Sequence, residues 1–409
     1  MGRAASTEEA GWFLVGPKMA NALTDPCRAR ILMELSVRPM SPSQFAEKVG
    51  GDLSHISRCF RQLAAWGYAE IIEERPGSRR GASIEHVYSG IQRVHFDTSE
   101  WDGVPHSERE ALSRSVLESY FSRITEAIEA GTFDDEVDRH LSWDSVAVDR
   151  MAWEQLVTRL DQILEGLPEL EVQAARRLLE PGEKPIPATV GLLAFRSPQS
   201  PEVMLKAPPR YQTPPDLPFG NSPFVLTPKT AKALSNRWRS QILMELNARP
   251  MSPSQFVEEV GGSMTHIARC FRQLAEWGFI EVVEERKGGR HRGGIERIYR
   301  NTQRAYFDTP SWETLPRFLR NEVSKSFLAS FMERITEAIN AGTFDAEVDR
   351  HLSWKPVTLD RVAWAEITTC LDEILEWLPV LEAESIKRLE KVENFIPATV
   401  GLACFRSPW

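Results

Sequence analysis

A short run of hydrogen-bonding and cationic side chains is the first feature of this sequence that could do chemistry. The run extends from Leu53 to Trp66. Its apolar residues Ile56, Phe60 and Leu63 recur at helical spacing, so the other positions share an outer face. That face carries Ser54, His55, Ser57, Arg58, Arg61 and Gln62. Side chains of these kinds read base edges and grip phosphates, so the pattern predicts a DNA-contacting helix. The alternative is a helix whose arginines are only solvated.

The same pattern occurs twice, because most of the chain is an internal repeat. Ile31-Leu-Met-Glu-Leu35 recurs as Ile242-Leu-Met-Glu-Leu246, which is an offset of 211 residues. The offset continues through Val137-Asp-Arg-His-Leu-Ser-Trp143, which recurs from Val348. A period of this length indicates duplicated domains and not a solenoid. The second predicted DNA-contacting helix, Met264 to Trp277, carries Thr265, His266, Arg269, Arg272 and Gln273.

Metal binding is a second chemistry that these helices suggest. His55 and Cys59 lie four residues apart, as do His266 and Cys270, which places two donor atoms on one helix face. Two donors do not complete a tetrahedral zinc site, so we expect the histidine to face DNA and the cysteine to pack inward. An acidic cluster with one imidazole also recurs, but helix capping and solvation explain it. Its members are Asp134, Asp135, Asp138 and His140, then Asp345, Asp349 and His351. The sequence therefore predicts no metal site and no cofactor.

A basic hairpin is expected directly after each of these helices. Two strand-like runs, Tyr68 to Glu73 and Ile84 to Tyr88, flank a segment rich in turn residues and arginine at 75–83. The second copy has a similar segment at 286–294. Cations at a hairpin tip suit a phosphate backbone or a minor groove. The predicted contacts are Arg75, Arg79, Arg80, Arg286, Lys287, Arg290 and Arg292.

Two helices are expected before each DNA-contacting helix. In the first copy, one begins at 25–26 with an Asp cap and Pro, and buries Ile31, Leu32 and Leu35. The next opens at Ser41-Pro42 and stops at the glycine pair 50–51.

Helix, helix, turn, helix and basic hairpin together resemble the winged-helix regulators of bacteria, specifically the ArsR-like type. The residues that carry the resemblance are Asp25-Pro-Cys-Arg-Ala-Arg-Ile-Leu32, Leu53-Ser-His-Ile-Ser-Arg58 with Leu63 and Gly67, and Glu85-His-Val-Tyr88. The second copy departs from them at 236–239 and at Ala268 in place of Ser57. The resemblance covers about the first 80 residues of each half. It implies a transcriptional regulator whose third helix enters the major groove. The cysteine motif of arsenic and cadmium sensors is absent.

The remainder of each half is expected to be an α+β extension that pairs the halves and could hold an effector. The first copy predicts a helix over Ser107 to Ala130, a strand over His140 to Val148, a helix from Asp149 to about Leu179 and a strand over Ala188 to Phe195. Recurring aromatic residues could line an apolar pocket, and ordinary core packing is the alternative. They are Trp101, Trp143, Trp153, Phe195, Trp312, Trp354, Trp364 and Phe405.

Composition and motifs limit the function classes. The net charge of −9 argues mildly against nucleic acid, so only the local distribution of charge can support DNA binding. Enzyme motifs such as GxGxxG, GxxxxGK[ST], HExxH and GxSxG are missing, and we expect no enzyme. Five cysteines without a CxxC pair favour reduced thiols. No apolar stretch is long enough to span a bilayer, and we expect a cytoplasmic protein without membrane contact.

These observations predict an α+β, mainly α, chain of two winged helix-turn-helix domains with extensions, arranged as a pseudo-dimer. The expected parts are winged-helix domains at 11–98 and 224–309, extensions at 99–198 and 310–409, and a Pro-rich linker at 199–223. The expected function is a DNA-binding, ligand-responsive repressor of transcription, acting as a monomeric pseudo-dimer or a homodimer. The partners would be double-stranded DNA and a small-molecule effector. The alternative is a winged-helix protein without enzymatic activity that binds small molecules or proteins.

Overall fold

The computed structural model shows an α+β chain whose larger sheet is antiparallel where its pairings are defined. It divides into two compact units, Met1–Glu126 with Leu352–Val357, and Ala127–His351 with Thr358–Trp409. The residues that the structure describes are 12–14, 25–35, 38–76, 84–90, 93–95, 105–198, 235–248, 250–287, 295–302, 312, 315–388 and 394–408. The predicted linker at 199–223 lies outside them, as do Trp101, Arg79, Arg80, Arg290 and Arg292.

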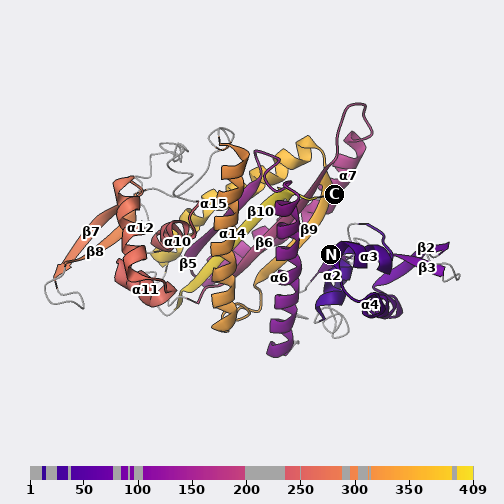
Figure 1. The fold of residues 1–409 in the computed structure, drawn as a ribbon, viewed down its shortest axis with the longest axis horizontal. Helices are drawn as coiled ribbons and strands as arrows, with labels where there is room; N and C mark the ends of the chain where they lie inside the picture. The colour runs from indigo at the N-terminus through magenta and orange to yellow at the C-terminus, as the bar shows by residue number, and fades with distance from the viewer. Residues whose placement is uncertain are drawn as a thin grey trace, which may run out of the picture. The chain divides into compact units, whose positions relative to one another are not determined.

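The first unit contains three short helices, a hairpin and most of one long helix (Figure 1). These elements are α2 (Pro26–Leu35), α3 (Pro42–Val49), α4 (Leu53–Ala65), β2 (Ala69–Pro76), β3 (Ile84–Gly90) and α6 (His106–Glu129). Two three-residue strands, β1 (Trp12–Leu14) and β4 (Arg93–His95), pair in parallel. The predicted helix starts and both hairpin strands are confirmed.

Local capping explains where the short helices begin and end. Ser41 caps α3 by accepting a hydrogen bond from Gln44 N, and the Gln44 side chain accepts one from Ser41 N. This reciprocal box satisfies two otherwise unpaired amides. Gly50 and Gly51 then take φ values of 77° and 108°, which glycine adopts without steric cost. Asp52 caps α4 directly afterwards, so three consecutive residues, 50–52, make the turn between the two helices.

Aromatic packing fixes α4 against the rest of its unit. Phe60 is fully buried between Phe45 of α3, at a ring-centroid distance of 5.8 Å, and Tyr88 of β3, at 5.1 Å. Tyr88 also forms a two-way backbone bridge with Met40, with N–O distances of 2.9 Å. One face of α4 is therefore committed to the core, and its opposite face is left for solvent.

The second unit repeats this arrangement. Its elements are α10 (Arg237–Ala248), α11 (Pro253–Val260), α12 (Met264–Glu276), β7 (Ile280–Lys287), β8 (Ile295–Asn301) and α14 (Arg317–Asn340). Phe271 lies between Phe256, at 6.0 Å, and Tyr299, at 5.3 Å. The bridge between Met251 and Tyr299 is also repeated. The internal sequence repeat thus corresponds to a repeat of local structure.

Three strands of the second unit pair in the order β5-β10-β6. They are β5 (His140–Val148), β6 (Ile186–Arg196) and β10 (Ile396–Arg406). A further strand, β9 (His351–Leu359), has its residues 352–357 in the first unit. Within the second unit, β10 pairs antiparallel with both β5 and β6. Strands before and after the linker therefore alternate, and β5 has no pairing with β6, the other strand of its own half.

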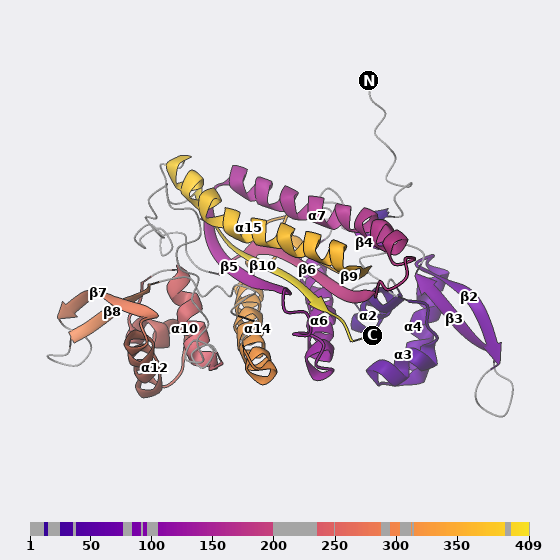
Figure 2. The ribbon, with the colours of Figure 1, turned by 90° about the horizontal axis from the view of Figure 1, so that it is seen from above.

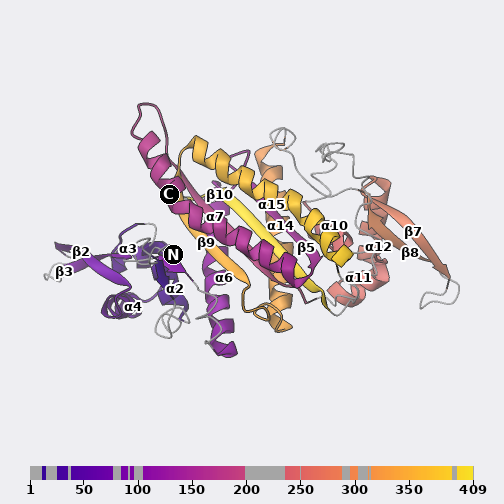
Figure 3. The ribbon, with the colours of Figure 1, turned by 180° about the vertical axis from the view of Figure 1, so that it is seen from behind.

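The central strand pair has a near-symmetrical register. Leu402 of β10 lies opposite Leu192 of β6, and these are equivalent positions in the two copies. Two long helices, α7 (Arg150–Arg177) and α15 (Arg361–Arg388), lie side by side along one face of β5, β10 and β6 (Figures 2 and 3). Both helices contain a proline, Pro168 and Pro379, and the predicted helix from Asp149 to about Leu179 corresponds to α7.

Contacts in the second unit occur in exchanged pairs. Arg388 donates to Asp149, with Nε–Oδ2 at 2.6 Å, and Arg177 donates to Asp360 in the same way. His140 contacts Asp372 at 2.8 Å, and the equivalent His351 contacts Asp161 at 2.9 Å. Three more kinds of contact are exchanged in the same way. The indoles of Trp153 and Trp364 donate to Asp349 and Asp138. Arg196 pairs with Glu347 as Arg406 pairs with Glu136, and Phe195 packs on Phe344 as Phe405 packs on Phe133. Each of these contacts therefore has a counterpart between the equivalent residues of the other copy of the repeat.

Buried ion pairs join each group of short helices to the long helix of its own unit. In the first unit, Arg123 of α6 lies 3.6 Å from Glu34 of α2 and is 2% exposed. In the second unit, Arg334 of α14 lies 2.5 Å from Glu245 of α10 and is 4% exposed. Removing one partner of such a pair leaves a buried charge and costs about 3–5 kcal/mol.

In the part of the chain that is described, no helix is both long and apolar enough to cross a membrane.

Candidate nucleic-acid interface

The outer face of α4 carries the side chains that the sequence predicted for it. Arg58, Arg61 and Ser54 are exposed, whereas His55, Ser57 and Gln62 are half-buried. Arg58 Nη2 lies 3.0 Å from His55 Nδ1, and Arg61 Nε donates to the Ser57 carbonyl at 3.2 Å. These contacts hold both guanidinium groups along the helix surface.

The outer face of α12 is similar but less polar. Thr265, His266, Arg269 and Arg272 are exposed, and Arg272 Nε donates to the Ala268 carbonyl at 3.3 Å. Ala268 replaces the hydroxyl-bearing Ser57, so α12 offers one fewer hydrogen-bonding side chain on this face. Its N-cap residue, Ser263, makes no side-chain capping bond, unlike Asp52 of α4.

Within the described part of the chain, the arginines on these two faces are not paired with carboxylates. Among the residues that the structure describes, no ion pair to Asp or Glu involves the two arginines of α4 or their equivalents on α12, which are Arg58, Arg61, Arg269 and Arg272. Their exposed positive charge is therefore available to an anionic partner.

The two predicted glutamine contacts point partly inward. Gln62 Oε1 accepts a hydrogen bond from Arg28 of α2 at 3.4 Å, and Gln273 Oε1 accepts one from Arg239 of α10 at 3.2 Å. Arg28 also lies over the ring of Trp66 at the end of α4, at 5.3 Å, and Arg239 lies over Trp277 at the end of α12, at 5.2 Å. The glutamine oxygens thus help to fix each third helix to its first helix.

The hairpin strands are less basic than the sequence suggested. Arg75 pairs with Glu73, with Nη2–Oε2 at 2.6 Å, and Arg286 pairs with Glu284 at 2.7 Å. Hydrogen bonds from these arginines lower the pKa of Glu73 and Glu284. The first hairpin has four glutamates and one arginine in its described strands, and the second has equal numbers of acidic and basic residues. Any positive charge at the tips comes from residues outside the described part, while Lys287 lies at the end of β7.

The aromatic residues proposed for an effector pocket are packed in the interior. Trp143 stacks on Phe331 at 5.9 Å, and Arg139 lies over Trp312 at 4.7 Å. Seven of the eight residues are described, and each is at most 9% exposed; they are Trp143, Trp153, Phe195, Trp312, Trp354, Trp364 and Phe405. Core packing accounts for their burial, and the effector pocket stays a prediction. A shallow depression elsewhere, between α7 and α15, is lined by Met151, Arg159 and Trp377 among others.

The acidic clusters of both copies serve as structural ion pairs. Asp134 is 1% exposed and binds Arg139, with Nε–Oδ1 at 2.5 Å, and Asp345 binds Arg350. Asp138 and Asp349 accept hydrogen bonds from the indoles of Trp364 and Trp153. Sequence reasoning explained these residues by capping and solvation, and it missed the pairing across the repeat because the partners come from the other half.

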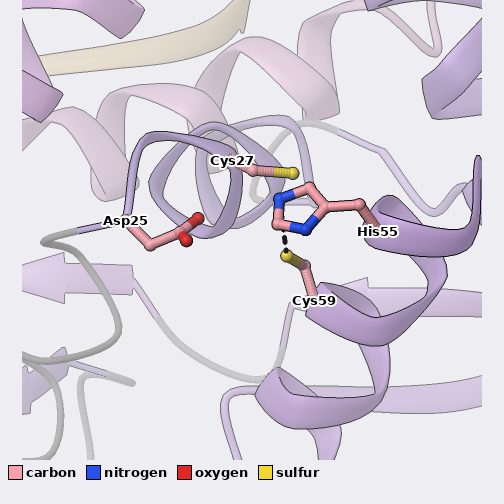
Figure 4. Close-up of side chains that lie close together, drawn as sticks. All are labelled: Asp25, Cys27, His55 and Cys59. Atoms are coloured by element: carbon pink, nitrogen blue, oxygen red, sulfur yellow. Dashed lines mark hydrogen bonds between the residues drawn. The ribbon is translucent and has the colours of Figure 1, made fainter. Parts of the chain in front are cut away.

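Four possible metal ligands lie together in the first unit (Figure 4). Asp25 and Cys27 come from the start of α2, and His55 and Cys59 come from α4. Their donor atoms all lie within 4.8 Å of one another. Burial and the neighbouring Cys59 raise the pKa of the Cys27 thiol to about 12, and burial also raises the pKa of Cys59. Both thiols are consequently protonated and weakly nucleophilic near neutral pH when no cation is bound.

Comparisons with known proteins do not assign this chain to a family. No family model matches the sequence. No curated protein matches it. No solved structure matches it.

Proposed function

We propose that this chain is a DNA-binding regulator of transcription, and that α4 and α12 each contact a major groove. The observation that carries the proposal is the set of four exposed arginines on these helices, none of which pairs with a carboxylate in the described part of the chain. Each helix follows a tight glycine turn and is anchored on its opposite face by a buried phenylalanine. This combination presents a rigid cationic surface of the size that a major groove accepts.

The repeated unit of three helices and a hairpin supports a winged-helix assignment for both halves. The backbone of Met40 forms an antiparallel bridge with Tyr88, and Met251 does the same with Tyr299. In each half, one residue before the third helix thus pairs with the second hairpin strand, as a short third strand would. We further propose that the chain is a covalent pseudo-dimer, since the exchanged contacts and the interleaved sheet in the second unit are those of a two-fold interface. A pseudo-dimer would read two similar but unequal half-sites, because α12 lacks the hydroxyl of Ser57.

DNA binding can be tested by selecting bound duplexes from a random pool and measuring affinity by fluorescence anisotropy. The logarithm of the affinity should fall linearly with the logarithm of salt concentration, with a slope of about 0.9 for each phosphate contact. Replacing Arg58→Ala together with Arg269→Ala should reduce that slope by up to about 1.8 if both contact phosphates, and should weaken binding.

A charge-matched control separates local contacts from net charge. Arg114 and Lys325 are exposed on α6 and α14 and pair with Glu110 and Glu322. The double variant Arg114→Ala with Lys325→Ala removes the same charge and should bind like the wild type. If both double variants bind equally well, α4 and α12 are not the contact surface.

A second candidate function is protein binding by the hairpins. Ile71, Ile72 and Ile84 are 46%, 50% and 60% exposed in the first copy, and Val282, Val283 and Ile295 occupy equivalent exposed positions in the second. The net charge of −9 also suits a partner other than DNA. A weak salt dependence, with no duplex enriched from the pool, would favour this function over DNA binding.

A further inference from the structure

We infer that Asp25, Cys27, His55 and Cys59 form a binding site for a thiophilic divalent cation, and that this site exists only in the first half of the chain. Two thiols, one imidazole and one carboxylate match the donor types that Zn²⁺ takes in tetrahedral sites. Hard cations such as Mg²⁺ and Ca²⁺ prefer an all-oxygen set, so the two sulfur donors favour zinc. The sequence alone offered two of these donors, and folding supplies the other two.

The distances suit a tetrahedral ion. Zinc bonds of about 2.3 Å to sulfur and about 2.0 Å to nitrogen, at the tetrahedral angle, place the two donors about 3.5 Å apart. In the structure, Cys59 Sγ lies 3.7 Å from His55 Nε2. The whole set lies within 4.8 Å, so shifts of about 1 Å or less in side chains would bring all four donors to bonding distance. Figure 4 shows Asp25 just before α2, Cys27 in α2, and His55 and Cys59 in α4, with their side chains turned toward one another.

The surroundings can accommodate the charge of the site. Two thiolates and a carboxylate around Zn²⁺ leave one net negative charge. Arg28 Nη1 lies 3.6 Å from Asp25 Oδ2, so its guanidinium offsets part of that charge. Three of the four ligands are partly exposed, so an ion can enter from solvent.

The second half provides an internal comparison. Cys270 Sγ lies 3.7 Å from His266 Nε2, which is the same spacing as in the first half. The other two donors are replaced, because Asn236 stands in place of Asp25 and Trp238 in place of Cys27. Trp238 packs 6.4 Å from the ring of Phe256, in the hydrophobic cluster of its unit. The second half therefore keeps only a two-donor remnant.

Zinc at this site would also change one arginine of α4. A guanidinium can only donate, so the contact between Arg58 and His55 Nδ1 requires that Nδ1 carry no proton. A neutral imidazole that binds zinc through Nε2 carries its proton on Nδ1, where it donates to an acceptor. Binding thus displaces Arg58 from His55 and ties the start of α2 to α4. The metal site itself does not depend on the proposed DNA binding.

The test is a metal titration of the full chain, reduced and freed of metal, without DNA. Co²⁺ should give the intense visible bands of a tetrahedral site and a thiolate charge-transfer band that saturates at one equivalent per chain. Zn²⁺ should displace it, and competition with a chromophoric chelator gives the affinity. Cys27→Ser should lower that affinity by more than about 100-fold, beyond the loss typical of an outer-shell change. Far-ultraviolet circular dichroism of the metal-free variant checks that the fold is retained.

The matched control is Cys270→Ser, which alters the two-donor remnant. It should keep one equivalent with unchanged affinity. The inference is overturned if Cys270→Ser loses the cobalt spectrum as Cys27→Ser does, or if two equivalents bind. It is also overturned if a chain whose five thiols are shown to be reduced binds no Co²⁺ or Zn²⁺. Loss of binding only after oxidation, restored by a reductant, would support the paired thiols as ligands.

Discussion

Helix α14 approaches strand β10 closely at Gly401, and replacing this residue by alanine tests that packing. Gly401 lies in the middle of β10, paired with Trp143 of β5 and Leu193 of β6. A Cβ atom at this position would lie 2.2 Å from Cζ of Phe331 and 2.9 Å from both of its Cε atoms. Ordinary carbon contacts are about 3.5–4.0 Å, so the ring would have to retreat by more than about 1 Å.

The surroundings make that retreat costly. Phe331 is 3% exposed and stacks on Trp143, which is itself 6% exposed. Overpacking of this kind costs about 1–3 kcal/mol. The second unit contains roughly 280 residues, and an unfolding entropy of about 2.1 cal/mol/K per residue converts that cost to a fall in Tm of about 2–5 °C.

Urea unfolding and calorimetry of Gly401→Ala measure the effect, and two further variants interpret it. Gly166→Ala, at an exposed position in α7 with no atom near its new Cβ, should be neutral or stabilising by about 0.5–1 kcal/mol. Phe331→Leu combined with Gly401→Ala should be less destabilised than the sum of the single variants, with a coupling of at least about 0.5 kcal/mol. A Gly401→Ala chain as stable as the wild type, or single effects that simply add, would show that helix α14 does not pack on the sheet as described.

Three further predictions follow from the contacts of the second unit. Arg388 lowers the pKa of Asp149, so this pair stabilises the fold above pH about 4 and loses its effect as the pH falls further. Asp149→Asn, which can still cap α7, should therefore flatten the fall of the urea-unfolding free energy below pH about 4. An unchanged dependence of that free energy on acid pH would contradict the pairing. A fragment of residues 1–198 lacks β10, the strand that pairs with β5 and β6, so light scattering should find a folded homodimer; a stable folded monomer would argue against the interleaved sheet. Cys404 is buried and burial raises the pKa of its thiol, whereas Cys370 is partly exposed. Alkylation of the native chain near neutral pH, followed by mass spectrometry, should therefore find Cys370 modified well before Cys404. The reverse order would contradict the burial of β10.

The amino-acid sequence by itself determined the local elements of this protein. Ser41 and Gln44 form a capping box that needs no distant partner, and the glycines at 50 and 51 set the turn before α4. Strand β5 has the bounds that its pattern predicted, His140–Val148. Helical periodicity likewise separated the buried Phe60 from the exposed Arg58. These features follow from interactions over a few residues, which a single sequence displays directly.

Only the tertiary structure decided which distant residues meet. Hydrophobic alternation marks β5 and β6 as strands but does not specify their partner, and the structure pairs both with β10 from the other half. The ion pair of Arg388 with Asp149 likewise joins residues from the two halves of the chain, which no local pattern brings together. The four-donor cluster also required the start of α2 to approach α4, because Asp25 lies 30 residues before His55 in the chain. Such contacts depend on non-local packing and hydrogen bonding, and the local pattern of a sequence carries no record of them.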